Sequence, residues 1–158
     1  METGKDGQSN ANSTISGNIA VGRPGGASYG GGIRNGGMLT VNDSTIGGNT
    51  AAGDFYPEHS YGVGGGIANF GTLTLNNSTI SGNANGGGID LQPGGFGGGI
   101  YNDNAGSLTV NNGTVSGNSS ASGSGIFNYG TATLQNTIVA YNNSGSDENC
   151  DGTQKATT

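Results

Sequence analysis

The stretch GTLTLNNSTISGN, residues 71–83, decides the fold because the chain repeats it. Its copies are GMLTVNDSTIGGN at 37–49, GSLTVNNGTVSGN at 106–118 and GTATLQNTIVAYN at 130–142, with a shorter copy, NSTISGN, at 12–18. Self-similarity at a regular spacing is typical of solenoids and other repeat architectures. One copy should therefore be one structural unit.

The spacing between equivalent isoleucines gives the length of a repeat unit. Ile33, Ile67, Ile100 and Ile126 each follow a glycine-rich run, at spacings of 34, 33 and 26 residues. The shortest unit is too short for a propeller blade, which needs about 40 residues. The longer units carry insertions at one corner, roughly at residues 19–29, 50–63 and 84–97.

Within a unit, three runs alternate aliphatic with small or polar residues, which is the pattern of strands with one buried face. They are GGGIxN, TLTL and STISGN. No stretch has a sustained helical period. We therefore expect an all-β fold, a right-handed parallel β-helix with about four to five coils, three short strands per coil and insertions at one corner.

Stacked coils place equivalent residues in columns. The expected inward columns are Ile33/Ile67/Ile100/Ile126, Leu39/Leu73/Leu108/Ala132, Val41/Leu75/Val110/Leu134 and Ile46/Ile80/Val115/Val139. Asparagine tolerates left-handed backbone at corners, and its amide can bond the asparagines above and below. The two expected asparagine columns are Asn35/Asn69/Asn102/Asn128 and Asn18/Asn49/Asn83/Asn118/Asn142.

Composition limits the classes of function. The chain has 158 residues, 36 of them glycine, and a net charge of -6, which argues against nucleic-acid binding. No apolar run is long enough to cross a membrane, so we expect no membrane insertion. We divide the chain into a polar segment (1–11), the β-helix repeats (12–142) and a polar, acidic tail (143–158).

The repeats resemble those of bacterial surface and secreted right-handed β-helix proteins, members of the pectate-lyase-like superfold. GGGI followed by TLTLNNSTISGN is also similar to the GGAI and FxxN repeats of polymorphic outer-membrane proteins. This resemblance implies an extracellular or cell-surface protein with a structural or adhesive role. The first residues, METGKDGQSN, lack the apolar segment of a signal peptide. We therefore expect a mature product, a subunit or a fragment of a longer array.

Signals for catalysis are weak. Residues 26–30, GASYG, match GxSxG, and Asp54 and His59 could complete a triad, but that motif needs a strand–turn–helix elbow. Coincidence explains the match better in so glycine-rich a chain. We expect no enzymatic activity, no cofactor and no metal site.

The middle insertion concentrates aromatic and charged residues in a chain that otherwise has few. Insertions on one side of a solenoid often form its binding face, although aromatic residues could also simply cover the coil. The candidate residues for binding a surface glycan are Asp54, Phe55, Tyr56, Glu58, His59 and Tyr61.

A second candidate face is rich in threonine. If Leu73 and Leu75 point inward, their neighbours point outward and repeat from coil to coil. This face resembles the ice-binding surfaces of antifreeze β-helices, although threonine is also an ordinary residue of solvent-facing strands. Its residues are Thr40, Thr72, Thr74, Thr109, Thr131 and Thr133.

We therefore expect a non-enzymatic extracellular structural or adhesive module. Because both ends of a β-helix expose unpaired backbone groups, we also expect copies to stack head to tail into filaments. The alternative is a ligand-binding β-helix, with a glycan on the insertion edge or ice on the threonine-rich face.

Overall fold

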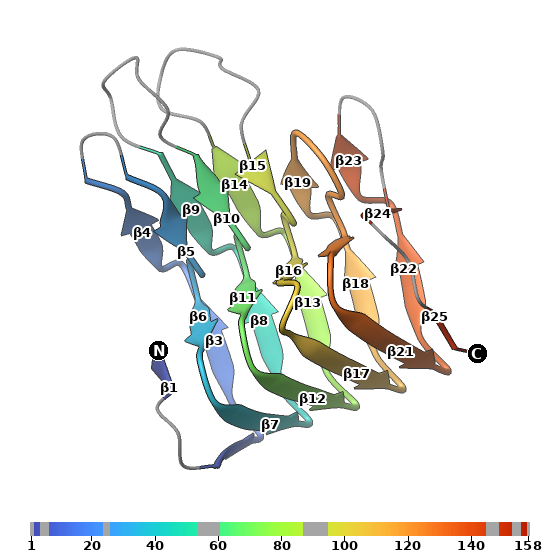
Figure 1. Cartoon of the computed structure of the whole chain (residues 1–158). Coiled ribbons are helices and arrows are strands. Elements are labelled where there is room, and N and C mark those ends of the chain that lie inside the picture. Colours follow the sequence, from blue (N-terminus) through green and yellow to red (C-terminus); the bar gives the residue numbers. More distant parts are fainter. Residues whose placement is uncertain are drawn as a thin grey trace.

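The chain is a parallel β-helix, as the repeats predict. The computed structural model describes residues 2–3, 7–23, 26–53, 61–86, 95–144, 149–152 and 156–157. The regular elements in these ranges are β-strands, which pair in parallel and stack into five sheets along one axis. In Figure 1 the coils follow one another from the N-terminal (blue) end to the C-terminal (red) end.

Three of the sheets come from the three runs of each repeat. Sheet A contains β1 (Glu2–Thr3), β6 (Ile33–Asn35), β11 (Ile67–Asn69), β16 (Ile100–Asn102), β20 (Ile126–Asn128) and β24 (Cys150–Asp151). Sheet B contains β2 (Gln8–Ala11), β7 (Met38–Asn42), β12 (Thr72–Asn76), β17 (Ser107–Asn111), β21 (Thr131–Gln135) and β25 (Ala156–Thr157). Sheet C contains β3 (Thr14–Ser16), β8 (Thr45–Gly47), β13 (Thr79–Ser81), β18 (Thr114–Ser116) and β22 (Ile138–Ala140). The sheets therefore extend beyond residues 12–142 at both ends.

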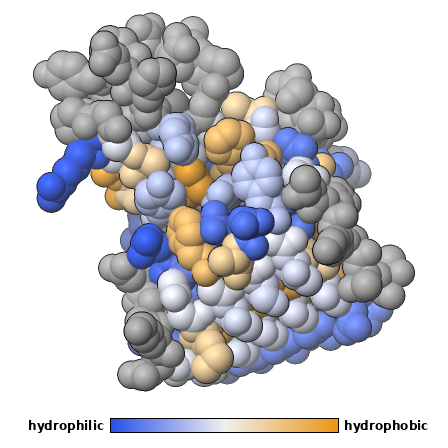
Figure 2. Space-filling view, viewed as in Figure 1, coloured by the Kyte–Doolittle hydropathy of each residue, from blue (hydrophilic) through white to orange (hydrophobic). Residues whose placement is uncertain are grey.

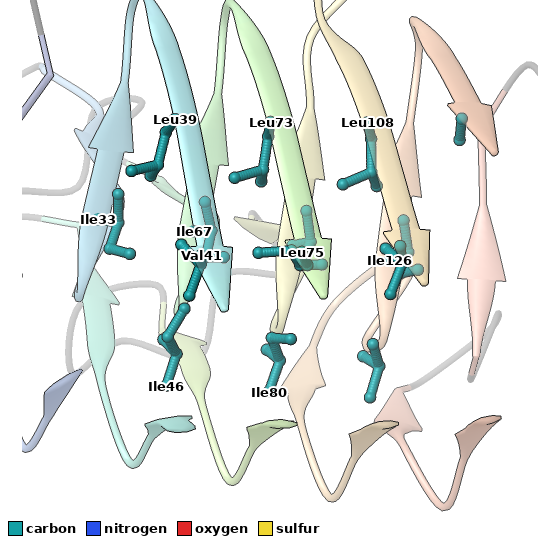
Figure 3. Packing of buried hydrophobic residues seen from close by; sticks show 14 residues of the cluster. Ile33, Leu39, Val41, Ile46, Ile67, Leu73, Leu75, Ile80, Leu108 and Ile126 are labelled. Atoms are coloured by element: carbon teal, nitrogen blue, oxygen red, sulfur yellow. The ribbon is translucent and has the colours of Figure 1, made fainter. Parts of the chain in front are cut away.

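All four inward columns have the predicted register. Ile67 pairs with Ile33 and Ile100, and Leu73 pairs with Leu39 and Leu108. The side chains of the central coils are fully buried and pack into one continuous cluster, which Figure 3 shows as rows between the sheets. Because side chains alternate between the two faces of each strand, every coil contributes one layer of aliphatic side chains to the core.

Two further sheets contain the segments that we expected to be insertion loops, and one of them also includes residues 119–120 and 143–144. Sheet D contains β4 (Ile19–Val21), β9 (Thr50–Ala52), β14 (Ala84–Gly86), β19 (Ser119–Ser120) and β23 (Asn143–Ser144). Sheet E contains β5 (Ser28–Tyr29), β10 (Gly62–Val63) and β15 (Gly95–Phe96). Each full coil therefore has more strands than the three predicted. These strands are two or three residues long and rich in glycine, alanine and serine, so they lack the aliphatic alternation that identified the others.

The glycine triplets follow the strands of sheet E and allow the backbone to pass close to sheet D. Gly64, the first of its triplet, has a φ of 66°, a left-handed value that side chains rarely adopt. Gly65, the second, lies so close to the carbonyl oxygens of Ala84 and Gly98 that a Cβ would clash with both. In the coil where Ser124 takes this second position, the described residues form only an isolated bridge, Phe96–Ser122, in place of a sheet E strand.

Replacing Gly65 with alanine is expected to separate sheets D and E locally, because the added methyl has no space. We expect a loss of about 1–3 kcal/mol in the free energy of unfolding, as for other overpacking substitutions. Thermal melts and hydrogen exchange of β10 and β14 measure it. Gly86→Ala is the matched control, since a Cβ at Gly86 meets nothing within 4 Å; similar losses for both variants would contradict this packing.

Both predicted asparagine columns form hydrogen-bonded ladders. Their expected left-handed backbone is not found, because the asparagines with positive φ among the described residues are those of another column, Asn12, Asn77, Asn112 and Asn136. In one ladder, each asparagine donates its backbone N–H and its Nδ2–H to the Oδ1 of the asparagine in the next coil; Asn49 donates both to Asn83 at 3.0 Å. Asn83 repeats this with Asn118, at 2.9 and 3.0 Å. In the other, Asn35 donates to Asn69 at 2.7 Å. Because these amides are buried and paired, they tie coil to coil where the backbone turns a corner.

Candidate binding face

The predicted loop edge is only partly described. Asp54, Phe55, Tyr56, Glu58 and His59 lie outside the described residues. Tyr61, the remaining member, is 38% exposed, and its ring lies edge-on to the ring of Phe96 with 6.1 Å between centroids. It belongs to a larger group of aromatic residues that the sequence analysis did not bring together.

This group, which we call the aromatic face, lies where sheets A and E meet. Residues that follow the inward isoleucines of sheet A point outward, and residues just after the buried asparagines of sheet A lie beside them. The outward residues of sheet E complete the face. Its members are Tyr29, Tyr61 and Phe96 at sheet E, Arg34, Tyr101 and Phe127 on sheet A, and Phe70, Tyr129 and Asp103 just after sheet A.

The rings of the aromatic face touch in an unbroken series across the coils. Tyr29 contacts Phe70 (centroids 5.4 Å apart), and Phe70 contacts Tyr101 (6.0 Å). Tyr101 lies parallel to Phe127 at 5.9 Å. Phe127 in turn contacts Phe96 at 4.7 Å. Stacking of the coils therefore assembles residues far apart in sequence into one surface.

Some residues of the aromatic face are buried, and others are exposed to solvent. Val63 and Ala68 point outward from sheets E and A, yet both are almost fully buried among the residues of this face. Tyr29 (38%) and Tyr129 (43%) keep much of their surface in solvent. Figure 2 views this side, where apolar and weakly polar side chains gather over the sheet A strands, with hydrophilic side chains around them.

Two charged groups belong to the face. The guanidinium of Arg34 lies over the rings of Phe70 and Tyr29, 5.2 and 5.9 Å from their centroids. The hydroxyl of Tyr101 donates a 3.0 Å hydrogen bond to the carboxylate of Asp103. Burial, and then this bond, raise the pKa of Tyr101 above its usual value, so the phenol stays neutral.

The threonine-rich face lies on sheet B with the predicted register. Thr74 pairs with Thr40 and Thr109, and Thr109 pairs with Thr133. Thr72 and Thr131 are exposed and the other four are half-buried. Sheet C carries a similar outward column that we did not single out, Thr14/Thr45/Thr79/Thr114.

The GxSxG match does not form a nucleophile site in the described residues. Ser28 lies in β5 of sheet E and is almost fully buried, and its hydroxyl has no hydrogen-bond partner there. A strand–turn–helix elbow is absent from this segment. The two other members of the possible triad, Asp54 and His59, are not described.

The described ranges contain neither a cluster of metal-ligating side chains nor a membrane-spanning helix. No three His, Cys, Asp or Glu side chains there come together to hold a metal ion. The expectations of no metal, cofactor or catalysis stay predictions.

Comparison with protein-family models, curated proteins and solved structures finds no match for this chain.

Proposed function

We propose that the chain is a non-enzymatic extracellular or cell-surface module, a rigid β-helix that adheres to a glycan through its aromatic face. The observation that carries this proposal is the unbroken series of rings from Tyr29 to Tyr129, with the carboxylate of Asp103 at its edge. Binding sites for small molecules and sugars combine aromatic surface with a few fixed polar groups. The apolar C–H faces of a pyranose pack on such rings, and its hydroxyls bond the polar groups.

The scaffold supports the same role. Asparagine ladders and parallel strands connect the coils, and each ring of the aromatic face lies on a paired strand or directly next to one. Rigid presentation lowers the conformational entropy lost on binding. The resemblance of the repeats to those of surface β-helix proteins agrees with an adhesive module outside the cell.

Replacing Tyr29, Tyr61 and Tyr129 together with serine is expected to abolish glycan binding. These three rings are the most exposed of the face, so the melting temperature should fall only modestly. A glycan microarray probed with both proteins measures the loss, and circular dichroism checks the fold. The control is Thr72→Ala with Thr74→Ala and Thr109→Ala on sheet B, which should bind normally.

Three outcomes would contradict the proposal. The wild-type chain could bind no glycan; the tyrosine variant could bind as well as wild type; or the threonine variant could lose binding while the tyrosine variant keeps it. A collapse of the melt in the tyrosine variant would mean that these rings serve packing alone.

Ice binding by the threonine-rich face is the second candidate. The observation that favours it is the register of threonines on sheet B, whose outward residues in β7, β12, β17 and β21 are all uncharged. A regular array of methyl and hydroxyl groups can order water. Absence of thermal hysteresis at about millimolar protein would remove this candidate.

Stacking of copies end to end is a further part of the proposal. Among the described residues, the outermost strands of sheets A to D pair with another strand on one side only. Such edges template association unless they are covered. At these outermost strands the inward columns no longer continue with aliphatic residues, because Gln8 pairs with Leu39 and Cys150 pairs with Ile126. Light scattering should detect association; a monomer at high concentration would contradict it.

A further inference from the structure

The large exposed apolar side chains on the described part of sheets C and D lie at opposite ends of the stack. At the N-terminal end they are Ile19 and Val21 of β4. At the C-terminal end they are Ile138 of β22 and Tyr141, which follows this strand. All four are more than half exposed, and Figure 1 shows β4 and β22 at the two ends of the molecule.

The strands between these ends have only small or polar residues at the same positions. The column of Ile19 continues with Thr50, Ala84 and Ser119, and that of Ile138 with Thr114, Thr79 and Thr45. The position of Tyr141 is taken in the other coils by Gly17, Gly48, Gly82 and Gly117, with φ between 63° and 67°. Tyr141 has a φ of 57°, which is rare for a bulky residue and is typical of functional positions.

The charges of the chain are also divided along the stack. Residues 1–42, up to the end of β7, contain three of the four Lys and Arg residues and two acidic residues, a net charge of +1. Residues 43–158 contain one Lys and eight acidic residues, a net charge of -7. Opposite charge at the two ends favours contact between unlike ends of two copies over contact between like ends.

The buried asparagine ladder that begins at Asn18 has a direction. Asn18 donates its N–H and Nδ2–H to Asn49, at 3.0 and 2.9 Å, and its Oδ1 accepts no hydrogen bond from the described residues. At the other end, Asn142 donates to the Oδ1 of Asn149, at 3.4 and 3.1 Å, and the Nδ2 of Asn149 donates to none of the described residues. The N-terminal end therefore offers an acceptor and the C-terminal end a donor, which match only when copies stack in the same direction.

We propose that a second copy of this chain docks head to tail, with Ile138 and Tyr141 of one copy against Ile19 and Val21 of the next. This contact rests on the end-to-end stacking proposed above and names the surfaces that meet. Sheets C and D of the two copies then lie in line, which removes the four apolar side chains from water. Because the contact joins unlike ends, each pair keeps one free end of each kind and can grow into an open filament.

Two double variants test the contact by giving each end the residues of the inner coils. Ile19→Thr with Val21→Ala changes the N-terminal end, and Ile138→Thr with Tyr141→Gly changes the C-terminal end. In sedimentation velocity, each variant alone should associate about tenfold more weakly than wild type, or less. An equal mixture should form one-to-one dimers as readily as wild type pairs, because each variant supplies one intact end. These dimers should not grow, since only the changed ends remain free.

Met38→Thr is the matched control. Met38 is also an exposed apolar residue whose neighbour in the next coil is a threonine, but it lies on sheet B. The control should associate as wild type, and circular dichroism melts check the fold of every variant. An equal loss in the control, or a mixture that forms no dimers, would overturn the head-to-tail contact.

The same experiment separates this contact from stacking itself. A wild-type chain that stays monomeric at high concentration would overturn both. If the wild type associates and the two double variants associate equally well, stacking stands and the contact between these four residues is wrong. If only one double variant loses association, the copies meet through like ends, and the head-to-tail arrangement is wrong.

Discussion

Replacing Ile80 with aspartate is expected to unfold the β-helix. Ile80 is fully buried between Ile46 and Val115 in one of the inward columns. The core has one aliphatic layer per coil, so a carboxylate at this position contacts only apolar side chains. Burying an unpaired charge costs several kcal/mol, here at least about 4, which is comparable to the whole stability of many domains.

Thr74→Ala is the matched control for this prediction. Thr74 lies in the neighbouring sheet of the same coil but points outward and is half-buried. We expect its free energy of unfolding to change by less than about 1 kcal/mol. Thermal and urea melts followed by circular dichroism measure both variants, and similar losses would contradict the assigned register.

The second large effect is expected for Asn83→Ala. The side chain of Asn83 accepts bonds from the N–H and Nδ2–H of Asn49, and it donates to the backbone oxygen of Ile46 and to the Oδ1 of Asn118. Its removal leaves several buried polar groups without partners. At about 1–3 kcal/mol for each orphaned group, we expect a loss of about 3–5 kcal/mol. Equilibrium urea unfolding measures it.

Asn111→Ala is the control for the ladder. Asn111 donates a similar 2.9 Å bond to Asn76 in an outward column of sheet B, where water can replace it. The loss there should be below about 1 kcal/mol. If Asn111→Ala cost as much as Asn83→Ala, burial of the ladder would not be the source of its contribution.

The repeats predict the central coils of the β-helix, because aligning the copies places the residues of each aliphatic column at equivalent positions. Ile33, Ile67 and Ile100 align in sequence and pair in the structure without a shift. A one-residue slip would place the whole strand's core residues in solvent, so the register is strongly determined. The asparagine columns follow from the same alignment.

Sheets D and E were not predictable in the same way. Their strands pair through the backbone and depend on close approach of glycine, as at Gly65, rather than on aliphatic side chains. Short runs such as Thr50–Ala52 carry no alternation of apolar and polar residues. The sequence of these short runs is therefore typical of loops.

The aromatic face was missed because its rings are scattered from residue 29 to residue 129. A signal does exist once the units are aligned. Tyr101 and Phe127 each follow an inward isoleucine by one residue, and Phe70 and Tyr129 each follow a buried asparagine by one. These four rings therefore fall into outward columns when the repeats are aligned. The segment 54–61 stands out in the sequence instead, because its aromatic residues are close together along the chain.

The most direct test of glycan binding uses the tyrosines themselves. The chain has no tryptophan and six tyrosines, so ¹H–¹³C NMR of protein labelled in the tyrosine rings gives few, separable signals. Tyr141 is 92% exposed and follows β22 of sheet C, which makes it an internal control. With a glycan that binds on the array, the signals of Tyr29, Tyr61, Tyr101 and Tyr129 should shift together and saturate while Tyr141 stays unchanged. Saturable binding that shifts none of these four would contradict the aromatic face as the binding surface.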